Sequence, residues 1–109
     1  MKVNINNLDG EVIRYNETYV VEDNTFLKNL TLSKTILHPF KETSGHSHDG
    51  LEEVYFFQYG FGRIQIDDNF MNVTTGDIVL IPAGAFHKVY NDSSKEDLTF
   101  VCVFQKYER

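Results

Sequence analysis

The chain has 109 residues, of which 14% are aromatic and 24% are charged, and its formal net charge is −6 at pH 7. A chain of this length favours one domain with one core, so we predict a single domain over residues 1–109. The acidic balance and the lack of a lysine and arginine cluster argue against a nucleic-acid partner, because binding to phosphates needs many cations.

Targeting signals are missing from the sequence pattern. Cys102 is the only cysteine, so no disulfide forms within the chain, and a reducing compartment is the simplest prediction. The N-terminal stretch lacks the apolar segment of a secretory signal. No apolar run approaches the roughly 20 residues of a membrane-spanning helix. We therefore expect a cytoplasmic protein that does not use a membrane as a partner.

Short strands are predicted in the first third of the chain. Residues 2–7 and 11–16 flank Asp9-Gly10, a turn dipeptide, and are typical of edge strands. Residues 19–21 form another short candidate. From residue 30 to 37 the sequence LTLSKTIL repeats with a period of two rather than 3.6, which predicts a strand with one aliphatic face and one hydroxyl-bearing face.

The rest of the chain continues as short strands, and no window shows a sustained helical stripe. Turn residues separate the runs, as at Asp68-Asn69. This pattern is typical of an all-β antiparallel barrel or sandwich. We expect N-terminal strands in residues 1–29 and the core barrel in residues 30–105. The further predicted strands are residues 46–48, 53–59, 63–67, 70–73, 78–81, 86–90 and 98–104.

Two histidines and a glutamate are spaced so that they can converge on one point. His46 and His48 are two residues apart, so both imidazoles project from the same face of an extended strand. A turn-like gap follows, and Glu53 then opens the next strand. Two imidazoles from one strand and a carboxylate from its neighbour are a suitable ligand set for a divalent transition metal.

A third histidine follows further along the chain. The apolar run 78–81 ends at Pro82, Ala83-Gly84 turns the chain, and His87 begins the next strand-like segment. If these strands are neighbours, three histidines and one glutamate meet. The cofactor would be one divalent transition metal, and Zn, Fe, Mn, Ni and Cu all suit this ligand set. The alternative is a pocket in which the histidines donate hydrogen bonds to an organic ligand without a metal.

The spacing of these residues resembles the cupin family. The second cupin motif, G(X)5PXG(X)2H(X)3N, and the first, G(X)5HXH(X)3–4E(X)6G, both match, except that Phe40 stands at the leading glycine of the first motif. The resemblance covers residues 46–91 and implies a small single-domain cupin: an antiparallel jelly-roll β-barrel, or double-stranded β-helix. It also implies a metal held by His46, His48, Glu53 and His87. The matching positions are His46, His48, Glu53, Gly60, Gly76, Pro82, Gly84, His87 and Asn91.

Side chains near the predicted ligands are candidates for catalysis and substrate binding. Only Glu53, and not Glu52, has the motif's spacing to Gly60. By alternation Tyr55, Phe57 and Tyr59 share the face of Glu53 and line the barrel interior as substrate contacts. For Phe57, core packing is the alternative. A buried tyrosine hydroxyl needs a partner, which makes Tyr55 a candidate proton donor or base alongside Glu53.

The resemblance implies several functions. The first is a metal-dependent enzyme that acts on a small oxygen-rich substrate, such as a sugar derivative or a keto or hydroxy acid, by isomerisation, epimerisation or lyase chemistry. The alternatives are an Fe(II)-dependent dioxygenase and a non-catalytic sensor or binding module for a small molecule such as a sugar. We also expect a homodimer, formed where N-terminal edge strands pair with a second copy.

Overall fold

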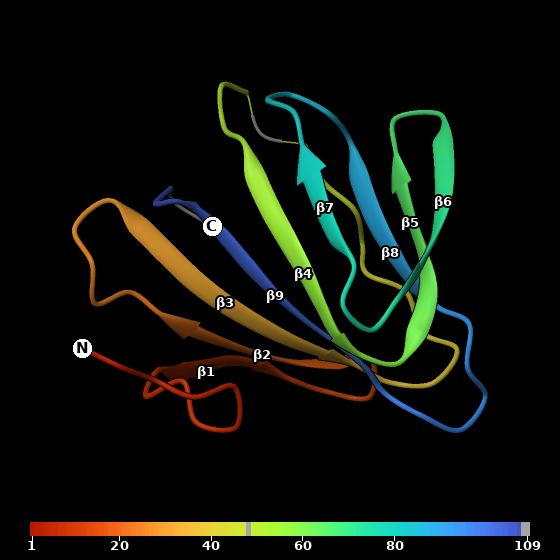
Figure 1. The fold of residues 1–109 in the computed structure, drawn as a ribbon, viewed down its shortest axis with the longest axis horizontal. Coiled ribbons are helices and arrows are strands. Elements are labelled where there is room, and N and C mark those ends of the chain that lie inside the picture. The colour runs from red at the N-terminus through yellow and green to blue at the C-terminus, as the bar shows by residue number, and fades with distance from the viewer. Residues whose placement is uncertain (48, 108–109) are drawn as a thin grey trace.

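The structure is a computed structural model that describes residues 1–47 and 49–107. In these residues the regular elements are antiparallel strands joined by turns (Figure 1). Within this part of the chain no helix has the length and apolar character needed to cross a lipid bilayer. The strands are β1 Glu11–Tyr15, β2 Tyr19–Asn24, β3 Leu30–Leu37, β4 Glu53–Tyr59, β5 Phe61–Ile66, β6 Asn69–Thr74, β7 Ile78–Ile81, β8 His87–Asn91 and β9 Leu98–Gln105.

Two sheets form the molecule, as predicted for a jelly-roll. The larger has the strand order β1-β2-β3-β9-β4-β7, and the smaller has the order β6-β5-β8. Isolated bridges of Glu42 with Tyr90 and of His46 with His87 extend the small sheet beyond β8. In Figure 1 the large sheet fans out from β1 to β7, and the strands of the small sheet, β8, β5 and β6, are drawn to the right of β7. From β3 onward each observed strand lies within a few residues of a predicted one. The strand predicted at residues 46–48 is not among them: His46 forms only an isolated bridge, and residue 48 lies outside the described residues.

The core lies between the two sheets. Leu37, Phe57, Ile64, Val89 and Leu98 are each at most 1% exposed, and they come from five different strands. Each large apolar side chain that is removed from water contributes about 1.5–3 kcal/mol to folding. The alternation of buried and exposed residues along the strands therefore fixes which face of each strand points inward.

The inward face of β3 is its polar face. Thr31, Ser33 and Thr35 are buried, whereas Leu30 and Leu32 lie on the opposite face and are partly or largely exposed. The N-terminal segment lies near that outer face, because the Nζ of Lys34 donates a hydrogen bond of 2.7 Å to the carbonyl of Ile5. The interior of the barrel therefore has a wall of hydroxyl groups on this strand.

One strand prediction in the N-terminal region is wrong, and a second is confirmed with a later end. Residues 2–7 do not form an edge strand, because the chain turns at residues 4–7: the backbones of Asn4 and Asn7 hydrogen-bond to each other at 3.2 and 2.9 Å, and the side chain of Asn4 accepts a 2.9 Å bond from the backbone of Asn6. Asparagine favours such local bonds over strand pairing. The second strand does not end at Val21. It continues to Asn24, because β2 pairs with β3 along that whole length.

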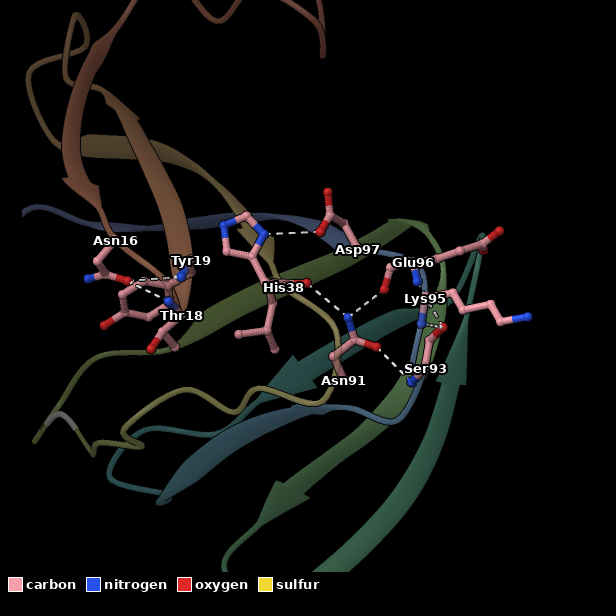
Figure 2. A network of polar contacts seen from close by, with 10 residues as sticks. Asn16, Thr18, Tyr19, His38, Asn91, Ser93, Lys95, Glu96 and Asp97 are labelled. Carbon is pink, nitrogen blue, oxygen red and sulfur yellow. Dashed lines mark hydrogen bonds and ion pairs between the residues drawn. The ribbon is translucent and has the colours of Figure 1, made fainter.

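The amide of Asn91 ties together the end of the barrel at which β8 ends. Its Nδ2 donates to the carbonyl of Leu37 at 2.9 Å and to that of Glu96 at 2.8 Å, and its Oδ1 accepts a 2.9 Å bond from the backbone of Ser93 (Figure 2). Asn91 is only 3% exposed. The motif asparagine therefore joins the ends of β3 and β8 to the loop before β9.

Candidate metal centre

His87 begins β8 and is held with one ring nitrogen aimed away from the backbone. It follows a tight turn in which the backbone N–H of Ala85 donates to the carbonyl of Pro82 at 3.2 Å. The Nδ1 of His87 lies 3.1 Å from the carbonyl oxygen of Ala85. Because a carbonyl only accepts, Nδ1 carries the hydrogen of this bond, and Nε2 is left to interact with other groups. This is the usual way in which a protein orients a metal-binding histidine.

Glu53 opens β4 beside His87. It pairs with Ile81 of β7 and Phe104 of β9, so its backbone is fixed from both sides. Its Oε2 lies 3.1 Å from the Nε2 of His87, and both side chains are 3% exposed. A carboxylate and an imidazole lone pair this close in a buried place repel each other unless a cation, either a proton or a metal ion, lies between them. Glu52, by contrast, is exposed.

His46 reaches the same point from the segment before β4. Its backbone exchanges two hydrogen bonds with that of His87, at 3.1 and 2.9 Å, and the two rings meet edge-on with their centroids 4.3 Å apart. Gly45 makes this approach possible. Its φ of 77° is in the left-handed region, and a Cβ at this position would lie 2.5 Å from the ring of Phe86.

Phe40 departs from the first motif, but its backbone has the conformation that glycine favours. Its φ is 59°, in the left-handed region. The backbone N–H of Phe40 donates to the carbonyl of Ser93 at 3.0 Å and so holds the turn in place. A side chain in this conformation costs about 1–2 kcal/mol. The turn thus keeps its shape without the glycine.

Three of the four predicted metal ligands come together. One ligand atom from each of His46, Glu53 and His87 lies within 4.8 Å of the other two. Two imidazole nitrogens and one carboxylate oxygen are a donor set that fits a divalent transition metal. The fourth predicted ligand, His48, lies outside the described residues. The residues that the structure describes therefore fit the implied metal, and nothing in them identifies which metal it is.

A cavity of about 180 Å³ opens beside this cluster. His46, Glu53 and Tyr55 line it, together with hydroxyl groups on β3, from Ser33 and Thr35. At the ~30 Å³ that one water molecule occupies in the liquid, this volume corresponds to about six waters. The cavity is therefore suited to a small, polar molecule.

Tyr55 is a neutral hydrogen-bond donor in the wall of this cavity. Burial away from water raises the pKa of its hydroxyl well above the ordinary value, and Cys102 and Glu53 raise it further through charge and hydrogen bonding. Its ring is stacked on Phe100 at 5.4 Å and meets the ring of His87 edge-on at 5.6 Å. A phenol with a raised pKa keeps its proton, so this environment favours the donor role over the role of a base.

Phe57 and Tyr59 do not line the cavity. Phe57 is completely buried and packs 5.4 Å from the ring of Phe100, as the core alternative predicted. The prediction that Tyr59 shares the face of Glu53 is wrong. The register of β4 with β9 shifts between Phe57 and Tyr59, and this bulge turns Tyr59 outward, where it is 53% exposed.

Sequence reasoning missed the part of the cavity that the N-terminal strands supply. Arg14 of β1 and Tyr19 of β2 line it, as does Tyr107 after β9. The alternation in β3 marked Ser33 and Thr35 as sharing a face, but nothing local showed that this face points inward. For Arg14 there was no usable signal, because its direction depends on how β1 pairs with β2.

His38, which belongs to neither motif, lies outside the cluster. Its Nδ1 is 3.0 Å from the Oδ1 of Asp97, and the two side chains are 31% and 46% exposed (Figure 2). Figure 2 shows this pair next to the hydrogen bonds of Asn91. His38 therefore belongs to the end of the barrel that Asn91 ties together and not to the cavity.

The sequence of this chain matches one family model and one curated protein. The family model described as a cupin domain matches residues 34–104. The chain is 24% identical over 100 residues to the uncharacterized protein MJ1618 of Methanocaldococcus jannaschii, which covers 82% of this chain and 80% of that protein.

Among solved structures, a predicted oxalate decarboxylase of Thermotoga maritima has a TM-score of 0.78 at 20% identity, covering 98% of this chain and 100% of the other. A mutant of the Bacillus subtilis oxalate decarboxylase OxdC has a TM-score of 0.80 at 22% identity. It covers 93% of this chain but only 29% of its own. At these identities the likeness shows the fold alone.

Proposed function

Because the chain belongs to the cupin family, we propose that it is a metal-dependent enzyme that acts on a small oxygen-rich molecule by isomerisation, epimerisation or lyase chemistry. The substrate class is a sugar derivative or a keto or hydroxy acid. The observation that carries the proposal is the convergence of the buried Glu53 and His87 with the more accessible His46 beside a polar cavity.

The metal would be held by these three side chains, with His48 as the fourth predicted ligand. When bound, a divalent ion supplies Lewis-acid chemistry, which polarises a carbonyl or lowers the pKa of an enol. Glu53 and His87 are suited to hold it because both are buried and 3.1 Å apart, so a cation between them removes a repulsion that solvent cannot relieve.

Tyr55 and Glu53 are the residues best suited to move protons. The Tyr55 hydroxyl keeps its proton and faces the cavity, where it can donate a hydrogen bond to an oxygen on which negative charge develops. The Glu53 carboxylate lies in the same wall and is the candidate to accept a proton from carbon next to a carbonyl group. Ser33 and Thr35 can orient substrate hydroxyl groups from β3.

Metal analysis of purified protein tests the site directly. After loading with Zn, Mn, Fe or Ni and removal of free ions, we expect about one metal ion per chain. His87→Ala should reduce the content to below about a tenth of that, because it removes a ligand. His38→Ala is the matched control, since His38 is also hydrogen-bonded to a carboxylate but lies outside the cluster. Full occupancy in His87→Ala would overturn the proposal.

A second measurement separates the reaction classes. Solvent deuterium exchange into keto acids or sugar derivatives, dependent on Tyr55 and Glu53, supports isomerase or lyase chemistry. Oxygen uptake by the iron-loaded protein without such exchange would favour the dioxygenase alternative. Tight binding without either signal would favour a binding module.

A further inference from the structure

One cation lines the cavity beside the proposed metal centre. Arg14 of β1 is in its wall, and among the described residues of that wall no other lysine or arginine is present. The residue lies outside the part of the chain that matches the family model, residues 34–104. Arg14 therefore does not belong to the stretch of sequence by which the chain is assigned to its family.

A β-bulge directs Arg14 into the cavity. In the pairing of β1 with β2, Val12 is opposite Glu22 but Arg14 is opposite Val21, so Ile13 is the extra residue. Val21 is buried and lines the cavity. Without the bulge Ile13 would face Val21, and Arg14 would lie on the outer face, because a shift of one residue exchanges the two faces of a strand.

The guanidinium is held at the bulge and keeps donors for a ligand. Its Nη1 donates to the carbonyl of Ile13, the bulged residue, at 2.8 Å. In the described parts of the chain no carboxylate forms an ion pair with it. Arg63 on the other sheet differs, because its Nε and Nη2 bond to the carboxylate of Asp92 at 2.8 and 3.0 Å. Arginine has five N–H donors in a fork that matches a carboxylate.

We propose that Arg14 selects a small carboxylic acid as the ligand of this cavity by binding a carboxylate at the end remote from the metal. This inference rests on the proposed metal site and names its substrate class. A divalent ion with one carboxylate ligand leaves a single positive charge, and Arg14 adds a second. The cavity therefore favours an anion over a neutral sugar, although the chain as a whole is acidic.

Size and topology narrow the ligand further. Arg14 and Glu53 reach the cavity from β1 and β4, which are separated by β2, β3 and β9 in the sheet. A ligand that meets both ends needs two functional groups: oxygen atoms that chelate a metal, and a second carboxylate. The 180 Å³ volume suits an acid of about three or four carbon atoms. Hydroxyl groups from Ser33 and Thr35 lie between the two ends.

Calorimetric binding to the zinc-loaded full chain tests this assignment. The probes are malate and its monoamide, in which the carboxylate remote from the hydroxyl group is replaced by a neutral amide of nearly the same shape. We expect the wild type to prefer malate. Arg14→Gln should weaken malate binding about 10- to 100-fold and amide binding less than about two-fold, because a charge-assisted bond is lost only with malate.

Two further variants complete the design. Arg14→Lys should recover part of the malate affinity, since it restores the charge but not the fork. Arg63→Gln removes the same charge from the opposite sheet and should leave both affinities unchanged. Equal weakening of both probes by Arg14→Gln, or unchanged malate binding, would overturn the inference.

Zinc content measured in the same samples separates the two proposals. If the wild type binds zinc but shows no preference for malate, the Arg14 inference fails and the metal proposal stands. If the protein retains none of Zn, Mn, Fe and Ni after loading and Arg14→Gln still weakens malate binding selectively, the metal proposal fails and the binding of a carboxylate by Arg14 stands. If no metal is retained and no selective effect is found, both are wrong.

Discussion

The two ends of the barrel each carry a histidine paired with a carboxylate, and the two pairs have almost the same length. At one end the Nε2 of His87 is 3.1 Å from Glu53, and both side chains are 3% exposed. At the other end the Nδ1 of His38 is 3.0 Å from Asp97, with 31% and 46% exposure (Figure 2). Asp97 precedes β9, whereas Glu53 pairs with Phe104 near the end of β9, so the strand separates the two pairs.

The difference in burial, and not in geometry, decides what each pair can do. Water screens and solvates the His38–Asp97 pair, and such exposed pairs contribute at most about 1 kcal/mol. Water cannot do this for the Glu53–His87 pair, so its electrostatics depend on a proton or a bound ion. One end of the barrel is therefore suited to chemistry, and the other to holding strands together.

Asn91→Ala should produce the largest change at the strand-joining end. The substitution removes an amide that satisfies two carbonyls and one N–H in a buried place, so the free energy of unfolding should fall by about 2–4 kcal/mol. Urea unfolding monitored by circular dichroism measures this. Asn69→Ala, at an exposed position, is the control and should change stability by less than about 0.5 kcal/mol.

Metal content shows whether the two ends are independent. The folded fraction of Asn91→Ala should bind as much metal as the wild type, because none of the partners of Asn91 is a proposed ligand. Loss of metal from this variant would contradict the division between the two ends.

Tyr55→Phe should produce an intermediate effect that depends on pH. The raised pKa of Tyr55 means that above about pH 10 the unfolded chain loses this proton while the folded chain keeps it. The free energy of unfolding of the wild type should therefore fall by about 1.4 kcal/mol for each pH unit above about pH 10. Tyr55→Phe should remove this part of the decline. Urea unfolding between about pH 9 and pH 11 tests the sign.

Tyr59 is the matched control for this experiment. The charge of Glu96 and a hydrogen bond that the Tyr59 hydroxyl donates to it also raise the pKa of Tyr59, but that tyrosine is exposed at the other end of β4. Because this group is exposed and its interaction is screened by water, Tyr59→Phe should remove a smaller part of the decline above about pH 10 than Tyr55→Phe removes. If the two variants behave alike, burial at the cavity is not what holds the proton on Tyr55.

Asp97→Asn should produce the smallest effect. Because the pair that it disrupts is partly exposed, stability should fall by about 0.2–1 kcal/mol, with metal content unchanged. Thermal unfolding at low and high salt measures this, and the difference from the wild type should shrink as salt rises. A loss comparable to that of Asn91→Ala would show that exposure does not distinguish the two pairs.

Local pattern was sufficient to predict most of the strands and the residues of the candidate cluster. Alternation with a period of two located β3 with its observed bounds, the apolar run that ends at Pro82 located β7, and the spacing to Gly60 chose Glu53 over Glu52. These features depend on neighbours along the chain. The glycine and proline turns, which need particular backbone angles, could be located for the same reason.

The directions of Tyr59 and Arg14 could not be predicted from the residue pattern along one strand, because they depend on pairing between strands. One bulge turns Tyr59 away from the cavity, and another turns Arg14 toward it. Each arises from register with a second strand, and alternation counted along one strand assumes that no residue is extra. The N-terminal error had a different cause, since asparagine side chains bonded locally and replaced the expected pairing.

The regular alternation of β3 has a consequence for how this protein can change in evolution. Thr31, Ser33 and Thr35 face inward, and Leu30, Leu32 and Ile36 face outward. Insertion or deletion of a single residue within this strand would exchange the two sets, giving the cavity a hydrocarbon wall and the surface a row of hydroxyls. Changes in length should therefore accumulate in the loops on either side of the strand, while the strand itself tolerates only substitutions.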